Sequence, residues 1–327
     1  MAPSDEKGGM SSHEDVLDRV PLRFLVGPTA SGKSGLSIAL AEAQEGKGPA
    51  FEIVSLDSMN VYRGLDVGTA KPTAEDRARV PHHLVDVADP RERFDLQSYV
   101  KLVRGVLASM ETRGALPIFT GGTGLYLAAL LRGVFEGPQT DLELRERLRA
   151  RAAGGGLEGL RRELVAADPE SAERIHPGDE RRTIRALEVF LQTGVPMSVH
   201  QAQWRSAEPP PRQGTALLAG LQMPTDALDA RIRARTAEML AGGWPGEALA
   251  LEESGALGPS ASQALGYATA AAVARGDMPV EEAAELISLR TRQFARRQRT
   301  WFRKFDIQWV DPRSESALGQ LRSILAV

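Results

Sequence analysis

Residues 27–34 read Gly-Pro-Thr-Ala-Ser-Gly-Lys-Ser, the pattern G-x4-G-K-[ST] of a phosphate-binding loop. The loop follows an apolar run at 22–26 and precedes helical apolar spacing over 35–44, which is the strand, loop and helix context that the motif requires. Backbone N–H groups in such a loop and the start of the next helix favour a bound phosphate. The candidate residues for diphosphate or nucleotide binding are Gly27, Pro28, Thr29, Ala30, Ser31, Gly32, Lys33 and Ser34.

Strand and helix patterns alternate after this loop. A buried strand is expected at 51–56, a helix at 97–112 and a third strand at 116–120. Strands that alternate with helices predict a parallel sheet covered on both faces. We therefore expect an α/β fold with a P-loop NTPase-like parallel sheet core flanked by helices and carrying a helical insertion domain.

The composition of the chain changes near Pro138, where Arg- and Glu-rich segments with helical patterns begin. The helices expected after the insertion cover 225–240, 247–253, 262–274 and 280–304, with strands at 217–222 and 306–310. The expected organisation is a disordered tail at 1–20, a core at 21–137, a helical insertion domain at 138–214, and the remainder of the core with C-terminal helices at 215–327.

Composition narrows the chemistry that is available. The chain has 327 residues, of which 42% are hydrophobic and 25% charged, and it contains no cysteine, so thiolate metal sites and cysteine nucleophiles are excluded. No apolar run is long enough for a membrane span, and the N-terminus lacks the apolar region of a signal peptide. We expect a cytoplasmic monomer that does not bind membranes.

The net charge of −3 hides a strongly basic segment. Residues 286–305 contain six arginines and one lysine and no acidic residue. On a helix, Arg292, Arg296, Arg299 and Arg303 fall on one face, where their guanidinium groups would follow a phosphate backbone. This pattern favours an RNA-binding surface over an ordinary solvated helix face.

Several blocks of the sequence resemble the bacterial tRNA dimethylallyltransferases, also called tRNA isopentenyltransferases, of the IPP transferase family. The first is Asp57-Ser58-Met59-Asn60-Val61-Tyr62-Arg63-Gly64, which is followed by Gly68-Thr69-Ala70-Lys71-Pro72. Four more match in order and spacing: 81–86 (PHHLVD), 121–126 (GGTGLY), 181–188 (RRTIRALE) and 290–304 (RTRQFARRQRTWFRK). In the related block at 263–268, Ala268 stands where the family usually has a charged residue.

The resemblance implies a reaction and its partners. Enzymes of this family transfer the dimethylallyl group from dimethylallyl diphosphate to N6 of adenosine 37, next to the anticodon, in tRNAs that read codons beginning with U, and they release diphosphate. The partners would be dimethylallyl diphosphate and the anticodon stem-loop of tRNA, and the phosphate loop would hold a diphosphate rather than ATP. The alternative from the loop alone is an ATP-dependent P-loop small-molecule kinase, since such loops serve many enzymes.

The candidate catalytic residues follow from the same reading. Asp57, at the carboxyl end of a predicted parallel strand, either accepts the N6 proton or binds Mg²⁺ together with Ser34. The Thr123 hydroxyl would orient the leaving oxygen or Asp57, the alternative being a helix cap. Arg231 and Arg235, spaced i and i+4, would bind the diphosphate if they do not lie on a solvated face.

The candidate tRNA contacts come from the family blocks and the arginine stripe. They are Asp57, Ser58, Met59, Asn60, Arg145, Arg181, Arg182, Thr183, Ile184, Arg185, Gln263, Gly266, Tyr267, Arg296, Arg297, Gln298, Arg299, Thr300, Trp301, Phe302 and Arg303.

Overall fold

The structure, a computed structural model, describes residues 15–46, 48–133, 137–138, 140–202, 212 and 215–327. Internal contacts divide the chain into two compact units. The core unit comprises Met1–Leu131 and Arg212–Val327, and the insertion unit comprises Arg132–Pro211. The predicted insertion domain, placed at 138–214, corresponds to the second of these units with slightly different ends.

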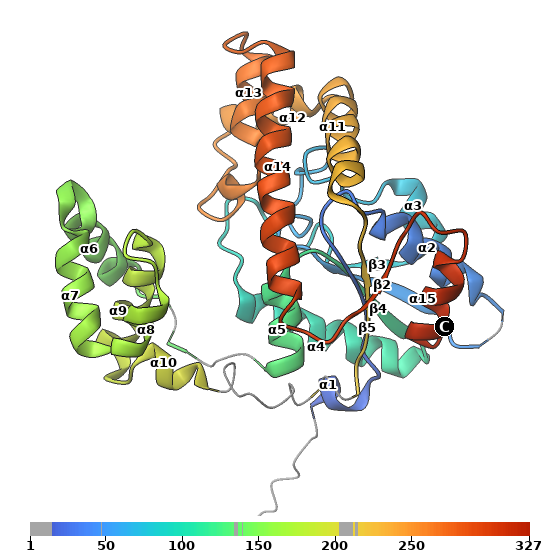
Figure 1. Cartoon of the computed structure of the whole chain (residues 1–327), viewed down its shortest axis with the longest axis horizontal. Coiled ribbons are helices and arrows are strands. Elements are labelled where there is room, and N and C mark those ends of the chain that lie inside the picture. The colour runs from blue at the N-terminus through green and yellow to red at the C-terminus, as the bar shows by residue number, and fades with distance from the viewer. Residues whose placement is uncertain (1–14, 47, 134–136, 139, 203–211, 213–214) are drawn as a thin grey trace, which may run out of the picture. The chain divides into compact units, whose positions relative to one another are not determined.

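A six-stranded sheet forms the centre of the core unit (Figure 1). Its strand order is β3-β2-β4-β1-β5-β6, and every neighbouring pair is parallel, as the sequence predicts for an α/β fold. The strands are β1 Arg23–Val26, β2 Phe51–Leu56, β3 His82–His83, β4 Leu116–Gly121, β5 Leu217–Leu221 and β6 Gln308–Val310. Because β1 and β4 lie side by side, the phosphate loop and the Gly121-Gly122 turn leave the sheet at the same edge.

Helices connect and cover these strands (Figure 1). The N-terminal part contributes α1 Val16–Arg19, α2 Lys33–Ala43, α3 Ala74–Arg79, α4 Leu96–Arg113 and α5 Gly124–Arg132. The C-terminal part contributes α11 Thr225–Ala241, α12 Trp244–Glu253, the 3-10 turn Ala261–Gln263, α13 Tyr267–Ala274, α14 Val280–Phe302 and α15 Ala317–Leu325.

The core beneath the phosphate loop is assembled from both ends of the chain. Leu25, Ile53 and Leu221 on three strands are buried in one cluster with Leu321 and Leu325 of α15. These positions belong to almost continuous apolar runs, which is the pattern of strands that are buried on both faces. The C-terminal helix therefore helps to fix the strand that leads into the loop.

The structure differs from the expectations at four elements. Residues 16–19, expected within a disordered tail, form α1, because Val16 and Leu17 are buried and Asp15 caps the helix. The rest of that tail, residues 1–14, lies outside the described residues. The short strand β3 and the terminal helix α15 were not expected. α13 begins at Tyr267 instead of 262, because Gly266 has a left-handed conformation that ends the preceding turn.

The insertion unit is helical, as its composition predicts. It contains α6 Leu142–Ala152, the 3-10 turn Ala153–Gly155, α7 Leu157–Ala167, α8 Pro169–Arg174, α9 Glu180–Thr193 and α10 Met197–His200. Its own apolar core includes Leu148, Leu160, Leu164 and Leu187. Buried Asp168 accepts hydrogen bonds from Ser171 N at 3.0 Å and Ser198 N at 2.9 Å, which tie the end of α7 to the starts of α8 and α10.

None of the helices in the described ranges is long and apolar enough to cross a membrane.

Candidate active site and nucleic-acid interface

The phosphate loop connects β1 to α2 and is held by contacts within the loop. Gly32 takes a left-handed conformation immediately before α2, a geometry that glycine adopts without strain. The Lys33 ammonium donates to the Pro28 carbonyl oxygen at 2.7 Å. The Ser31 hydroxyl is fully buried and has no hydrogen-bond partner within the described part of the chain. A buried hydroxyl without a partner is costly, so the loop is prepared for a ligand that accepts its hydrogen.

Two arginines from α11 complete a cationic cluster at this loop. A Cβ placed on Gly32 would lie 3.2 Å from a terminal nitrogen of Arg231, so that guanidinium group covers the loop. Burial, and after it the charge of Arg235, lowers the pKa of Lys33 to about 7, while the charge of Asp57 opposes this change. Burial likewise lowers the pKa of Arg235. The structure therefore brings Arg231 and Arg235 to the phosphate loop, where a diphosphate would relieve their mutual repulsion.

Asp57 and Thr123 meet where β2 and β4 end. Asp57 Oδ1 accepts hydrogen bonds from Met59 N at 2.8 Å and Asn60 N at 3.3 Å, which leaves the other carboxylate oxygen for a ligand. The Thr123 hydroxyl accepts a hydrogen bond from Ser58 N at 3.2 Å. The carboxyl ends of parallel strands are where α/β proteins bind ligands, so the predicted position of Asp57 is confirmed.

A cavity of about 290 Å³ lies beside these residues in the core unit. Its polar lining residues include Thr29, Asp57, Thr123, Arg235 and Arg297. The remainder is largely apolar and includes Ile232, Met239, Trp244, Leu265, Tyr267 and Ile287. A lining that combines cations and a carboxylate with many apolar side chains suits a ligand that carries both a charged and a hydrocarbon part.

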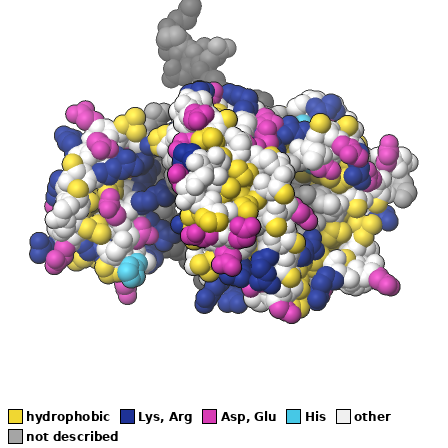
Figure 2. All heavy atoms as spheres, turned by 90° about the horizontal axis from the view of Figure 1, so that it is seen from above, with side chains coloured by type: hydrophobic (Ala, Val, Ile, Leu, Met, Phe, Trp, Pro, Cys, Tyr) yellow, Lys and Arg dark blue, Asp and Glu magenta, His cyan; other side chains and the backbone are white. Residues whose placement is uncertain are grey.

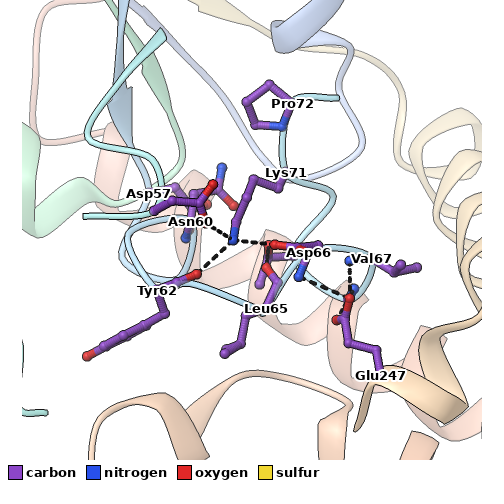
Figure 3. A network of polar contacts seen from close by, with 12 residues as sticks. Asp57, Asn60, Tyr62, Leu65, Asp66, Val67, Lys71, Pro72 and Glu247 are labelled. Carbon is purple, nitrogen blue, oxygen red and sulfur yellow. Dashed lines mark hydrogen bonds and ion pairs between the residues drawn. The ribbon is translucent and has the colours of Figure 1, made fainter. Parts of the chain in front are cut away.

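The loop that forms one wall of the cavity is held from two sides (Figure 3). Buried Lys71 donates to Tyr62 O at 2.7 Å, Asp66 Oδ1 at 2.5 Å and Asp86 Oδ1 at 2.6 Å. Glu247 of α12 accepts hydrogen bonds from the backbone N–H groups of 66, 67 and 68. Figure 3 shows both groups directed at this loop.

Sequence reasoning missed three residues of this wall. Glu247 is the first residue of a predicted helix and Trp244 precedes that helix, neither of them within a motif, and Lys71 was quoted only as part of a family block. The sequence feature that relates to this wall is the pair of glycines Gly68 and Gly266. A Cβ on either glycine would collide with the Trp244 ring, so both glycines allow the backbone to approach that indole.

Arg292, Arg296 and Arg299 of the predicted arginine stripe lie on α14, and Arg303 follows as the residue that caps its end. Arg296 and Arg303 are exposed, and Arg299 is half-buried and donates to Thr225 Oγ1 at 3.1 Å. Arg297 lines the cavity, where its guanidinium group lies 5.7 Å from the centre of the Phe294 ring. Figure 2 shows Lys and Arg side chains gathered into local groups on one face of the molecule, so local fields exist despite the net charge.

Several of the other residues predicted to contact tRNA are buried and therefore unsuited to direct RNA contact. Gln298 and Phe302 are 6% and 0% exposed, because they occupy the face of α14 that packs on the core. Tyr267 is 2% exposed and lines the cavity instead. Thr300 is exposed and Trp301 half-buried, while Gln263 and Gly266 lie in the turn before α13.

The residues of the insertion unit that were predicted to contact tRNA also include both buried and exposed side chains. Thr183 and Ile184 are buried within its helical core, so these side chains face away from solvent. Arg145 and Arg185 both pair with the buried carboxylate of Glu188, which compensates part of their charge. Arg181 and Arg182 are exposed at the start of α9.

Residues 60–305 match the family model described as IPP transferase. The chain is 46% identical over 294 residues to a tRNA dimethylallyltransferase of Anaeromyxobacter dehalogenans, covering 89% of this chain and 95% of that protein. It is 42% identical over 296 residues to a tRNA dimethylallyltransferase of Geobacter metallireducens, covering 90% of this chain and 93% of that protein.

Solved structures agree with the fold. The crystal structure of a tRNA isopentenylpyrophosphate transferase from Bacillus halodurans has a TM-score of 0.64 and 35% identity, over 93% of this chain and 95% of that one. A eukaryotic dimethylallyltransferase, described as acting on tRNA, has a TM-score of 0.71 and 25% identity, over 93% of this chain and 76% of that one.

Proposed function

The chain belongs to the IPP transferase family, and we propose that its core unit binds dimethylallyl diphosphate on the phosphate loop with the reacting adenosine beside Asp57. The activity is that of a tRNA dimethylallyltransferase, which forms N6-dimethylallyladenosine at position 37. Its substrates are tRNA and dimethylallyl diphosphate. We further propose that it acts on tRNAs that read codons beginning with U, through their anticodon stem-loop.

The observation that carries the assignment of roles is the composition of the cavity. Thr29, Asp57, Thr123 and Arg235 line it together with aromatic and aliphatic side chains such as Trp244, Tyr267 and Ile287. The diphosphate would lie against the phosphate loop, where Ser31 has an unused hydroxyl and Lys33, Arg231 and Arg235 supply positive charge. The dimethylallyl group would lie in the apolar part.

The reaction breaks the C1–O bond of the allyl diphosphate and forms a bond from N6 of adenosine to C1. Positive charge develops on the allyl group and negative charge on the departing diphosphate, so loop amides and cations directed at the diphosphate stabilise the transition state. Loss of one such interaction costs about 3–4 kcal/mol in typical cases. The free oxygen of Asp57 accepts the N6 proton, and Thr123, which accepts from Ser58 N, fixes the turn that carries Asp57.

We propose Mg²⁺ as the cofactor. The described residues contain no group of three or more His, Cys, Asp or Glu that would hold a metal without other ligands. Mg²⁺ that accompanies a phosphate usually takes only one or two protein oxygens, and the exposed Ser34 hydroxyl at the start of α2 would supply one of them. Asp57 would supply another only in the alternative in which it binds the metal instead of accepting the N6 proton. When bound, Mg²⁺ would neutralise charge on the diphosphate.

The exposed arginines of α14 would bind the RNA backbone, supported by Arg181 and Arg182 of the insertion unit. The adenosine must leave its stack to reach Asp57, as in other enzymes that modify bases. We also propose that the protein acts as a monomer and, because its substrate is tRNA, in the cytoplasm. The rival reading, an ATP-dependent kinase, accounts for the phosphate loop but not for the family match.

The testing experiment incubates the protein with unmodified tRNA, Mg²⁺ and labelled dimethylallyl diphosphate, with labelled ATP in a parallel reaction. We expect label in a single adenosine of the anticodon loop. Transfer of label from ATP to a small molecule, with none in RNA, would replace this proposal with the kinase. Sedimentation of the same sample gives the oligomeric state.

A further inference from the structure

Gln298 joins the arginine-bearing helix to both catalytic loops. Its Oε1 accepts a hydrogen bond from Thr29 N at 2.9 Å, and its Nε2 donates to Gly122 O at 3.0 Å. The first contact reaches the phosphate loop and the second reaches the turn that carries Thr123. Only a side chain with one acceptor and one donor in a planar head satisfies both groups, which is the property of an amide.

The packing around this amide leaves little freedom. A Cβ on Gly122 would collide with Gln298 Nε2, and a Cβ on Gly124 would lie 3.1 Å from Cβ of Trp301. Glycine at these two positions therefore lets α14 lie directly on the turn after β4. Gln298 is 6% exposed, so water does not replace its hydrogen bonds when they are lost.

The two faces of α14 have different tasks. Arg296 is exposed, Arg297 lines the cavity and Arg299 donates to Thr225, whereas Gln298 between them projects into the core. The helix that would hold RNA is thus the same rigid element that holds the phosphate loop and the Thr123 turn. A displacement of α14 would move the RNA-binding face and the diphosphate site relative to each other.

We propose that Gln298 is a positioning residue, which keeps the phosphate loop and the Thr123 turn in register with the RNA-binding face of α14. This inference rests on the proposed function. The Thr29 amide is committed to Gln298 and is not a diphosphate ligand; the amide instead fixes the shape of the loop that binds the leaving group. The second hydrogen bond fixes the turn against which Asp57 is held.

The test uses the full chain with Gln298→Ala, Gln298→Glu and, as a matched control on an exposed position of the same helix, Gln293→Ala. For Gln298→Ala we expect the Kd of inorganic diphosphate to rise and kcat to fall, each by about tenfold, equivalent to about 1.4 kcal/mol. The Kd of unmodified tRNA should not change, because no RNA contact is lost. Gln293→Ala should match the wild type in all three quantities.

The pH dependence of kcat in Gln298→Glu tests the positioning role, because a purely structural role would leave that dependence unchanged. As a carboxylate it can accept from Thr29 N but opposes Gly122 O, whereas the protonated acid can donate to that oxygen. Its kcat, divided by the wild-type value at each pH, should therefore increase as the pH falls. This ratio is measured on folded protein even if Gln298→Ala fails to fold.

Two results would overturn the inference: a fall in tRNA affinity that matches the fall in kcat, which would make Gln298 a direct RNA contact, or a Gln298→Glu ratio that does not change with pH. A wild-type protein that transfers no label to tRNA would instead contradict the proposed function. Diphosphate binding by Gln298→Ala and wild type distinguishes these failures, since it requires no transfer.

Discussion

The Tyr267 hydroxyl donates a hydrogen bond to Glu247 Oε1 at 2.6 Å, and the same carboxylate accepts from Val67 N at 2.7 Å and Gly68 N at 3.2 Å. The pair therefore connects α12 and α13 to the loop that follows Asp57. Burial and the neighbouring carboxylate raise the pKa of Tyr267, so it remains a donor. Because Tyr267 and Gly68 both line the cavity, this pair sets the distance between two of its walls.

Replacing Glu247 with Ala should destabilise the protein and impair catalysis together. Backbone N–H groups left without acceptors cost about 1–3 kcal/mol, and Tyr267→Phe, which removes one hydrogen bond, should cost about 1 kcal/mol. Urea unfolding measures the loss, and steady-state kinetics should show a higher KM for dimethylallyl diphosphate. Glu253→Ala, at an exposed position of the same helix, is the control. A stability loss without a change in KM would mean that Glu247 does not shape the cavity.

Asp57→Asn separates the two roles considered for this carboxylate. The amide oxygen can still accept from Met59 N, so the turn is retained, but the side chain can no longer take a proton. If Asp57 is the base, kcat should fall by about 10²–10⁴-fold at every Mg²⁺ concentration, without loss of tRNA affinity. Recovery of the rate at high Mg²⁺ would instead assign Asp57 to the metal.

The sheet and the position of Asp57 could be predicted because local sequence determines them. Residues 51–56 are a short apolar run, and β2 has those bounds. β3 has two residues and is defined by its pairing with β2, so it is too short for a pattern of alternating apolar residues to predict it. α15 was missed because its amphipathic face depends on burial of Leu321 and Leu325 beneath the sheet.

The site beyond its motifs depends on contacts between distant segments. Gln298 stands in an arginine-rich run whose composition indicates an exposed, RNA-binding surface, yet it is buried against a loop 269 positions earlier in the chain. Glu247 likewise acts on a loop about half the chain away, and nothing near it in sequence distinguishes it from Glu252 or Glu253. In both cases tertiary packing determines the role of the side chain, and the periodicity of a single sequence contains no information about contacts between distant segments.

Diphosphate binding should take up a proton at Lys33. Its pKa of about 7 in the free protein lies below the ordinary lysine value of 10.5, so the side chain is mostly neutral above pH 7, and a bound anion favours the charged form. Affinity for inorganic diphosphate in metal-free buffer should therefore weaken as the pH rises above about 7, at most tenfold per pH unit. Calorimetry in buffers of different ionisation enthalpy measures the uptake. Lys33→Arg, which is always charged, should bind without this contribution; equal uptake by both proteins would contradict the assignment.

Removing Arg296 and Arg299 together should weaken tRNA binding and flatten its salt dependence, because each phosphate contact releases counterions from the RNA. The slope of log K against log salt should decrease in magnitude by about 1.4–1.8 for two contacts. Filter binding with unmodified tRNA over a salt series measures the slope, and kcat at saturating tRNA should stay close to the wild-type value, since neither side chain lines the cavity. Arg275→Ala is the control, because Arg275 is exposed but paired with Glu252 and Asp277. An unchanged slope in the double variant would remove α14 from the RNA-binding surface, and a loss of kcat with unchanged affinity would place these arginines in the chemistry instead.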